Sequence, residues 1–182
     1  MAHAAVIYGG SRPAGNAALL ADIVAEGIAV ERIRVDRYPV EALVDHRHDA
    51  EGFGQVGAGY RALFDRILDA GVWIIASPIY WYGFPANLKA FIDEFSHLMR
   101  RPEYRFRERM QGKVAVLVLA GGDNPRLKGL PLVNQFYWIA DFLGMDFRGY
   151  VIGEGDRPGE VLQDGAAVSE AQRLNQIVKD LL

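Results

Sequence analysis

Two short, nearly uninterrupted apolar runs constrain the fold of this chain more than any other feature. They span residues 72–77 and 114–120, and Ser77 is the one polar residue in them. A run without polar alternation is typical of a strand that helices cover on both faces, as in the centre of a parallel sheet. Amphipathic stretches lie between the apolar runs, as expected of repeating strand–helix units. The sequence therefore predicts an α/β protein.

Further strands and helices follow from the spacing of the apolar residues. The strands are predicted at Ala4–Tyr8, Val30–Val35, Val72–Ser77, Val114–Ala120 and Phe147–Ile152. The helices are predicted from Asn16, as the capping residue, to about Gly27, at Tyr60–Ala70, after Pro85, at Pro131–Leu143, and through Leu174–Leu181. Charged residues alternate with apolar ones in the second strand, which places it at an exposed edge. Right-handed crossovers then favour a three-layer, doubly wound parallel sheet of five strands in the order 2-1-3-4-5.

Length and composition are those of an ordinary globular protein. The chain has 182 residues, enough for one full core and short for two, so a single domain is expected. A net charge of −3 gives no electrostatic case for nucleic-acid binding. The absence of cysteine excludes disulfides, iron–sulfur ligation and a cysteine nucleophile. No basic leader and no apolar stretch of roughly 20 residues is present, so a cytoplasmic protein without membrane contact is expected.

The loop Gly9–Ala17 follows a predicted strand and begins a predicted helix. Backbone N–H groups and the positive end of the helix therefore point toward one place, which suits a phosphate group. Ser11 and Asn16 would add hydrogen bonds, and Arg12 would add charge. The alternative is a turn whose glycines only permit close packing of strand and helix, and the loop by itself favours neither interpretation.

Two further loops follow predicted strands at the same edge of the sheet. Ser77–Pro85 carries the consecutive aromatic residues Tyr80, Trp81 and Tyr82, which cannot all enter the core. They indicate contact with a flat, partly apolar ligand, or else packing on the sheet and against another subunit. The loop Ala120–Pro125 has two glycines whose amides could meet a planar polar edge, although a plain turn would also explain them. Together the three loops fit a phosphorylated ligand with a planar ring, such as FMN.

Several segments resemble those of flavodoxin-like NAD(P)H-dependent FMN oxidoreductases. The segments are 8–16 (YGGSRPAGN), 77–83 (SPIYWYG) and 88–93 (LKAFID), and the resemblance covers nearly the whole chain. It implies a single flavodoxin-like FMN-binding domain over residues 1–182. It also implies an oxidoreductase that passes electrons from NADH or NADPH through bound FMN to a small acceptor such as a quinone.

The resemblance also implies which residues contact FMN, and it assigns no catalytic residue. The phosphate would be held by Ser11, Arg12, Gly15, Asn16 and Ala17. The isoalloxazine ring would be lined by Pro78, Ile79, Tyr80, Trp81 and Tyr82, and flanked on its other edge by Gly121, Gly122 and Asp123. The family commonly has hydroxyl residues where this chain has Gly10 and Ala17, so phosphate binding is expected to be weaker by about 1 kcal/mol for each.

Two other functions remain open from the sequence: an electron-carrier flavodoxin without its own NAD(P)H turnover, and a flavin-free binding module of the same fold. Carriers tend to be strongly acidic, and the mild charge argues against the first. The helix Pro131–Leu143 is apolar almost all round, which predicts a homodimer or higher homo-oligomer. The segment Asp45–Asp49 has the composition of a metal site but no third ligand at a defined distance, so a solvated polar loop is the preferred interpretation.

Overall fold

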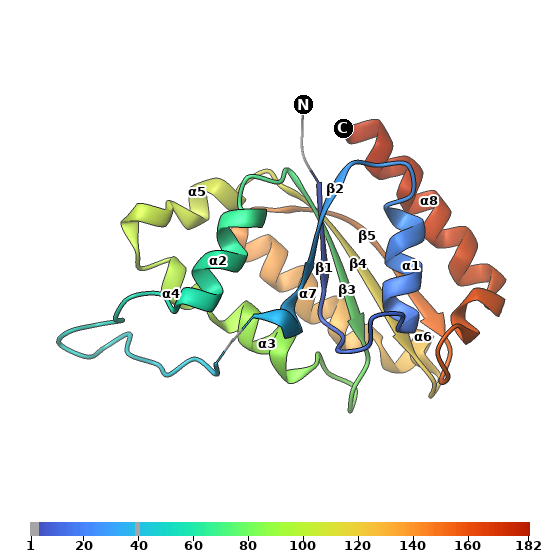
Figure 1. Cartoon of the computed structure of the whole chain (residues 1–182), viewed down its shortest axis with the longest axis horizontal. Helices are drawn as coiled ribbons and strands as arrows, with labels where there is room; N and C mark the ends of the chain where they lie inside the picture. Colours follow the sequence, from blue (N-terminus) through green and yellow to red (C-terminus); the bar gives the residue numbers. More distant parts are fainter. Residues whose placement is uncertain (1–3, 39–40) are drawn as a thin grey trace.

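A single five-stranded parallel sheet organises the chain (Figure 1). The computed structural model describes residues 4–38 and 41–182, so residues 1–3 and 39–40 are outside it. The strands are β1 (Ala4–Tyr8), β2 (Val30–Arg34), β3 (Val72–Pro78), β4 (Val114–Gly121) and β5 (Asp146–Glu154). Their order in the sheet is β2-β1-β3-β4-β5, with β2 at one edge. The predicted flavodoxin-like order is confirmed.

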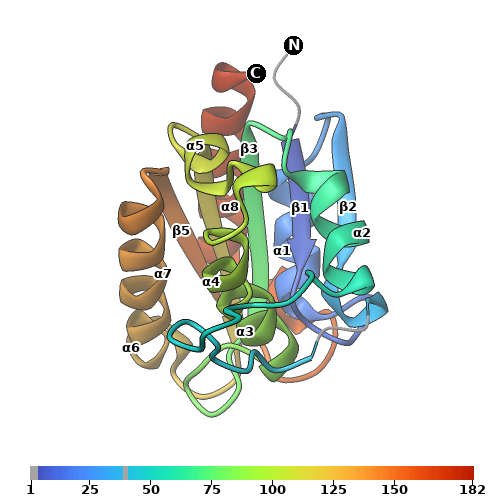
Figure 2. The ribbon, with the colours of Figure 1, turned by 90° about the vertical axis from the view of Figure 1, so that its left-hand side faces the viewer.

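Helices cover both faces of the sheet, which completes the three predicted layers (Figure 2). They are α1 (Asn16–Val24), α2 (Ala58–Ile67), α3 (Ala86–Asp93), α4 (Phe95–Leu98), α5 (Phe106–Met110), α6 (Pro125–Lys128), α7 (Leu130–Leu143) and α8 (Gly165–Leu181), with short 3-10 helices at Val35–Arg37, Pro102–Tyr104 and Glu160–Gln163. Helices α1 and α8 pack on one face of the sheet, and α2, α3, α4, α5 and α7 pack on the other. Among the described residues, no helix is both long enough and apolar enough to cross a membrane.

Several helix boundaries differ from the predicted ones. The first helix ends at Val24 and not near Gly27, because the chain turns and Gly27 takes a φ of 72°, which glycine adopts without strain. Asn16 was predicted to cap this helix, which is wrong: Gly15 is the N-cap and Asn16 is the first helical residue. The short helices α5 and α6 were not predicted, since four or five residues show no periodicity. Of the predicted long loop after Asp36, residues 41–57 hold turns but no helix or strand.

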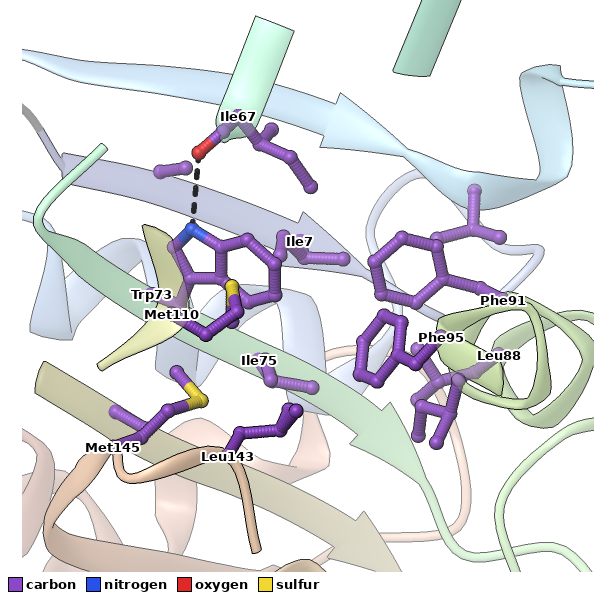
Figure 3. Close-up of a cluster of buried hydrophobic side chains, with 14 of the residues drawn as sticks. Ile7, Ile67, Trp73, Ile75, Leu88, Phe91, Phe95, Met110, Leu143 and Met145 are labelled. Atoms are coloured by element: carbon purple, nitrogen blue, oxygen red, sulfur yellow. Dashed lines mark hydrogen bonds between the residues drawn. The ribbon is translucent and has the colours of Figure 1, made fainter. Parts of the chain in front are cut away.

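Successive residues of the central strands enter two separate cores, which explains why these strands are continuously apolar. In β3, Val72 and Ile74 join the core beneath α1 and α8, whereas Trp73 and Ile75 join the larger core on the other face. Figure 3 shows Trp73 in the larger core, with its Nε1–H donating to the carbonyl oxygen of Ile67 at 3.1 Å. A hydrogen-bonded indole in the interior fixes the end of α2 against the sheet.

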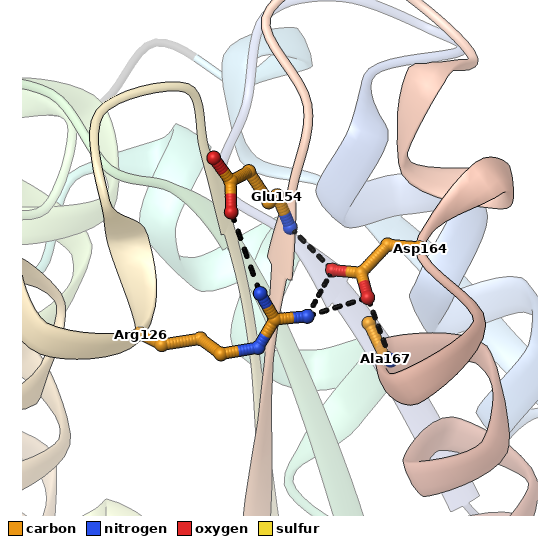
Figure 4. Close-up of polar contacts among 4 residues, drawn as sticks. All are labelled: Arg126, Glu154, Asp164 and Ala167. Atoms are coloured by element: carbon orange, nitrogen blue, oxygen red, sulfur yellow. Dashed lines mark hydrogen bonds and ion pairs between the residues drawn. The ribbon is translucent and has the colours of Figure 1, made fainter.

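Asp164 joins the end of β5 to the start of α8 (Figure 4). Its carboxylate accepts hydrogen bonds from the N–H groups of Glu154 (2.8 Å) and Ala167 (3.2 Å) and pairs with the Arg126 guanidinium. Burial alone would raise the pKa of Asp164, but these hydrogen bonds and the guanidinium outweigh it and hold the pKa below its ordinary value. The charged carboxylate therefore stabilises the folded state.

Replacing Asp164 by alanine is expected to lower the free energy of unfolding by about 1–2 kcal/mol at neutral pH, because an N-cap is lost. A lowered pKa means that the contribution is present above the ordinary value of 3.8 and is lost as the pH falls through the folded-state pKa. Urea titrations at several pH values should show that the difference in free energy of unfolding between parent and variant becomes smaller in acid. Asp164→Asn keeps a capping oxygen and should cost less. A difference that becomes larger in acid would contradict the stabilising role of the charged Asp164 carboxylate.

Candidate functional site

A cavity of about 270 Å³ lies at the carboxyl edge of the sheet, where the winding of the chain reverses. All three predicted loops contribute to its lining, together with the loop after β5. The lining residues are Tyr8, Gly10, Arg12, Gly15, Asn16, Ala17, Ala18, Ala76, Pro78, Ile79, Tyr80, Ala120, Gly121, Gly122, Gly155 and Asp156. Segments far apart in the sequence therefore meet around one space.

The start of α1 forms one wall of this cavity. The N–H groups of Asn16, Ala17 and Ala18 are at the open end of the helix, where no preceding turn supplies carbonyl partners. The first intrahelical bond is donated by Leu19 to the carbonyl oxygen of Gly15, at 3.0 Å. Gly15, the N-cap, has no side chain that could cover these donors. The helix mouth is therefore open to an anion, and the helix dipole favours a negative charge there.

Arg12, predicted to hold a phosphate, lines the cavity. The side chains of Ser11 and Asn16, predicted to do the same, lie elsewhere or bind other groups. Ser11 is exposed and outside the cavity lining. The Asn16 side chain binds the loop after β5: its Nδ2 donates to the carbonyl oxygen of Arg157 at 3.0 Å, and its Oδ1 accepts from the N–H of Gly159 at 2.9 Å. Asn16 therefore offers its backbone N–H at the helix mouth, while its side chain joins two walls of the cavity.

The packing explanation of the glycines holds for one of them. A β-carbon at Gly9 would be 2.5 Å from Cδ2 of Leu88, so a side chain there would collide with the buried face of α3. At Gly10 a β-carbon would be 3.1 Å from Cδ of Pro78, a tight contact beside the cavity. Gly9 is thus required for close packing, and Gly10 keeps the backbone next to the open space.

The aromatic residues after β3 form a two-residue hairpin that projects from the sheet. The N–H of Tyr80 donates to the carbonyl of Gly83 at 3.1 Å, and the N–H of Gly83 donates back at 2.9 Å. Trp81 and Tyr82 have φ values of 49° and 59°, a left-handed conformation that costs an L-residue about 1–2 kcal/mol. Trp81 is 96% exposed. The three aromatics do stay out of the core, as predicted, and such strain is typical of functional loops.

The hairpin aromatics divide between two adjacent spaces. Tyr80 lines the main cavity, whereas Trp81 and Tyr82 line a smaller pocket of about 160 Å³. Asp123 lines this smaller pocket as well, and Ile79, Gly121 and Gly122 line both. The two spaces are therefore neighbours, and a ligand with a wide ring could extend from one into the other.

A polar contact joins the aromatic hairpin to the loop after β4. The Tyr82 hydroxyl donates to Oδ2 of Asp123 at 2.8 Å, and Lys128 Nζ donates to the same oxygen. Lys128 Nζ also lies 5.4 Å from the centroid of the Tyr82 ring. Lys128, and after it Tyr82, lowers the pKa of Asp123, so the carboxylate stays charged. These groups are exposed, so the contact orients two loops and contributes little to stability.

Sequence reasoning missed the loop after β5, which brings Gly155 and Asp156 to the cavity. The N–H groups of Asp156 and Arg157 both donate to Oε2 of Glu160 at 2.9 Å, which fixes this loop. A β-carbon at Gly122 would be 3.0 Å from Cβ of Asp156, so the loops after β4 and β5 are in close contact. The sequence could have indicated this loop as part of the site, because it also follows the carboxyl end of a predicted strand.

The polar segment Asp45–Asp49 is held by local pairs. Arg47 Nε donates to both carboxylate oxygens of Asp45, at 2.8 and 2.9 Å, and this pairing lowers the pKa of Asp45 to about 2. His46 Nδ1 lies 2.6 Å from Oδ2 of Asp49. Within residues 4–38 and 41–182, no three histidine or carboxylate groups gather as a metal site. Four of its five residues are exposed and His46 is half-buried, which fits a solvated polar loop.

His97 has partners that the sequence did not reveal. The ring is buried between Glu94, whose Oε1 lies 2.7 Å from Nδ1, and the carbonyl oxygen of Gly54, 2.8 Å from Nε2. Burial raises the pKa of Glu94. Phe53 stacks on the imidazole with ring centroids 4.9 Å apart. These contacts attach the 41–57 segment to α4, away from the residues that line the cavity.

The chain is similar in sequence to several known proteins. A family model described as NADPH-dependent FMN reductase matches residues 2–145. A Bacillus subtilis protein, YwqN, named as an NAD(P)H-dependent FMN-containing oxidoreductase, is 45% identical over 171 residues, which are 93% of this chain and 94% of that protein. An FMN-dependent NADH:quinone oxidoreductase of Bordetella petrii is 30% identical in an alignment over 127 residues that covers 64% of this chain and 59% of that protein.

Solved structures are similar over almost the whole chain. The Trp repressor binding protein from Bacillus subtilis superposes with a TM-score of 0.80 at 40% identity, covering 94% of this chain and 96% of that one. An FMN-dependent NADH-azoreductase from Bacillus anthracis, in complex with FMN, gives a TM-score of 0.65 at 15% identity, covering 98% and 99%. At that identity the second likeness shows the fold alone.

Proposed function

The chain belongs to the family of NADPH-dependent FMN reductases, and from this premise we infer that it is an NAD(P)H-dependent FMN oxidoreductase. When bound, FMN supplies the redox chemistry, taking electrons from NADH or NADPH and delivering them to a small acceptor such as a quinone. The observation that carries this proposal is the cavity that is lined both by the open mouth of α1 and by Tyr80 of the aromatic hairpin. Anion donors and an aromatic surface around one space are what a phosphorylated ring system requires.

The residues around the cavity fit FMN, and we propose a role for each wall. The backbone N–H groups of Asn16, Ala17 and Ala18 bind the phosphate, with Arg12 beside them. Three residues of the second loop, Pro78, Ile79 and Tyr80, pack against the isoalloxazine ring. The backbone of Gly121 and Gly122 offers amides to the polar edge of the ring, where negative charge can be stabilised. Gly15 keeps the helix mouth uncovered.

Trp81, Tyr82 and Asp123 are proposed to act at the neighbouring pocket. Because this pocket shares Ile79, Gly121 and Gly122 with the main cavity, a group bound there would lie next to the ring. The exposed indole of Trp81 offers a flat surface to a planar donor or acceptor.

A cytoplasmic location of the protein also stays a prediction.

A visible absorption spectrum of the purified protein, with and without added FMN, tests the function directly. We expect the FMN bands to shift on binding, and NADH or NADPH alone to bleach them under anaerobic conditions. If dithionite bleached the bound flavin while neither nicotinamide nucleotide did, the electron-carrier alternative would replace the enzyme. A protein that left the FMN spectrum unchanged would support the flavin-free binding module.

We also propose that the exposed face of α7 joins two copies of the chain. The helix buries Leu132, Phe136, Ala140 and Leu143 toward the sheet, but Tyr137, Trp138 and Phe142 are 46–59% exposed. An apolar groove of about 550 Å³ lies between this face and helices α3 and α4. A large exposed apolar patch is typical of a subunit interface.

Replacing Trp138 by glutamate is expected to convert a dimer into a monomer, because a charge would be buried against apolar groups of the partner. Light scattering coupled to size-exclusion chromatography measures the change in mass. Gln172→Glu, which adds the same charge on α8 at the other face of the sheet, should leave the mass unchanged. A parent protein that is already a monomer would overturn this proposal.

A further inference from the structure

Arg34 makes contacts that the function described so far does not use. It is the last residue of the edge strand β2 and lies opposite Tyr8 in the register of the sheet. Its side chain is mostly buried, with 20% exposed. Nη2 donates to the carbonyl oxygen of Gly10 at 3.1 Å, and Nη1 donates to the carbonyl oxygen of Arg12 at 3.3 Å. One planar group therefore bridges two carbonyls of the loop between β1 and α1.

This bridge fixes the orientation of two peptide units in the loop. Carbonyl oxygens repel an anion, and Arg34 holds two of them in hydrogen bonds. Because the peptide unit is planar and trans, fixing the carbonyl of Gly10 toward Arg34 directs the N–H of Ser11 the opposite way. The carbonyl of Arg12 also accepts from the N–H of Gly15 at 3.3 Å, which closes the turn that leads into α1. Arg34 therefore braces the turn at the N-cap.

The charge of Arg34 is already balanced locally. Asp36 Oδ1 lies 3.2 Å from its Nε, and Oδ2 lies 3.4 Å from Nη2. A paired guanidinium contributes little net field at the helix mouth. Its effect on an anion should therefore come from the geometry of the loop. A lysine should not replace it, because all its donors are on one nitrogen and it lacks the rigid fork of two donor nitrogens.

We propose that Arg34 is a positioning residue for phosphate recognition, which it serves by bridging the carbonyls of Gly10 and Arg12. The proposal rests on the proposed binding of FMN in the cavity. It assigns a function to a residue that touches the loop and not the ligand. It also predicts that the effect of Arg34 is confined to the phosphate, since the ring would pack against the loops after β3 and β4, which also line the cavity.

The test compares FMN with riboflavin, which has the same ring and ribityl chain but no phosphate. Arg34→Met is expected to weaken FMN binding about tenfold or more, as for loss of charge-assisted hydrogen bonds, and to leave riboflavin binding within about twofold. Arg34→Lys should weaken FMN binding nearly as much as Arg34→Met does. Flavin fluorescence titrations give each dissociation constant, and thermal unfolding shows whether the variants are folded.

Arg148→Met is the matched control, because Arg148 is on β5, the strand at the opposite edge of the sheet, and pairs with Asp146, 2.6 Å away. It removes the same charge without touching the loop and should bind FMN as the parent does. The positioning role would be overturned if Arg34→Met bound FMN as tightly as the parent, or if its affinities for riboflavin and FMN fell by the same factor. If Arg34→Lys retained full affinity, charge and not bridging would be the cause. A parent protein that bound neither flavin would instead contradict the proposed function.

Discussion

Ala17→Asp is expected to weaken FMN binding by about a hundredfold or more while leaving the fold intact. Ala17 is in the first turn of α1, is 5% exposed and lines the cavity. A carboxylate there would lie close to the proposed phosphate position, where two like charges about 4 Å apart repel by several kcal/mol at an effective dielectric constant near 20. An acidic residue in the first turn favours the helix itself. Affinity and stability should therefore change independently.

Ala17→Asn separates charge from size, because asparagine has nearly the volume of aspartate but no charge. It should bind FMN much more tightly than Ala17→Asp in fluorescence titrations. Ala17→Ser adds the hydroxyl that the family commonly has in this loop, and we expect a gain of up to about fivefold, the worth of one hydrogen bond. If Ala17→Asp and Ala17→Asn lost FMN affinity equally, the larger side chain would be blocking the site, and repulsion of a phosphate would not be the cause.

Trp73→Ala is expected to lower the free energy of unfolding by about 3–5 kcal/mol, the usual cost of truncating a large buried aromatic residue. Trp73 is 1% exposed and contacts Phe91 and Phe95, with ring centroids 6.4 Å apart in each pair. Alanine would leave a cavity in the larger core and would remove the hydrogen bond to the carbonyl of Ile67. Urea unfolding followed by circular dichroism measures the difference.

Two variants test the reason for this loss. Trp73→Phe keeps an aromatic ring but leaves the carbonyl of Ile67 without its indole partner, so we expect a smaller cost of about 1–3 kcal/mol. Trp81→Ala makes the same exchange at the exposed hairpin and should change stability by less than about 0.5 kcal/mol. Similar losses at Trp73 and Trp81 would refute the view that burial determines the cost.

The strand order and the location of the cavity could be predicted because local patterns identify the strands and right-handed crossovers leave few ways to arrange them. Continuous apolar runs identify strands covered on both faces, and β3 and β4 are indeed in the centre of the sheet. Charged alternation in β2 identified an edge. Once the order is known, the carboxyl ends of the strands mark the ligand site, and the loops at Gly9–Ala17, Ser77–Pro85 and Ala120–Pro125 were found in this way.

Contacts between residues far apart in the chain were not predictable in the same way. Asn16 was expected to hold a ligand with its side chain, but that side chain reaches the backbone of Arg157 and Gly159. His97 showed no partner in the sequence, and it binds Gly54, on a segment without helix or strand. The division of Tyr80 from Trp81 and Tyr82 between two pockets depends on left-handed backbone angles at two aromatic residues, which no sequence rule favours.

The amino-acid sequence by itself determined the class of fold and which strands are covered on both faces, because hydrophobic periodicity records which faces of each element are buried. It also favoured the strand order, and with it the edge of the sheet at which we expect a ligand. Only the tertiary structure decided which side chains face the cavity and which ones hold its walls together. Side-chain partners such as Arg34 with the loop at Gly10, or Asp156 with Gly122, depend on how separate loops fold back on one another. Periodicity along the chain carries no record of that arrangement.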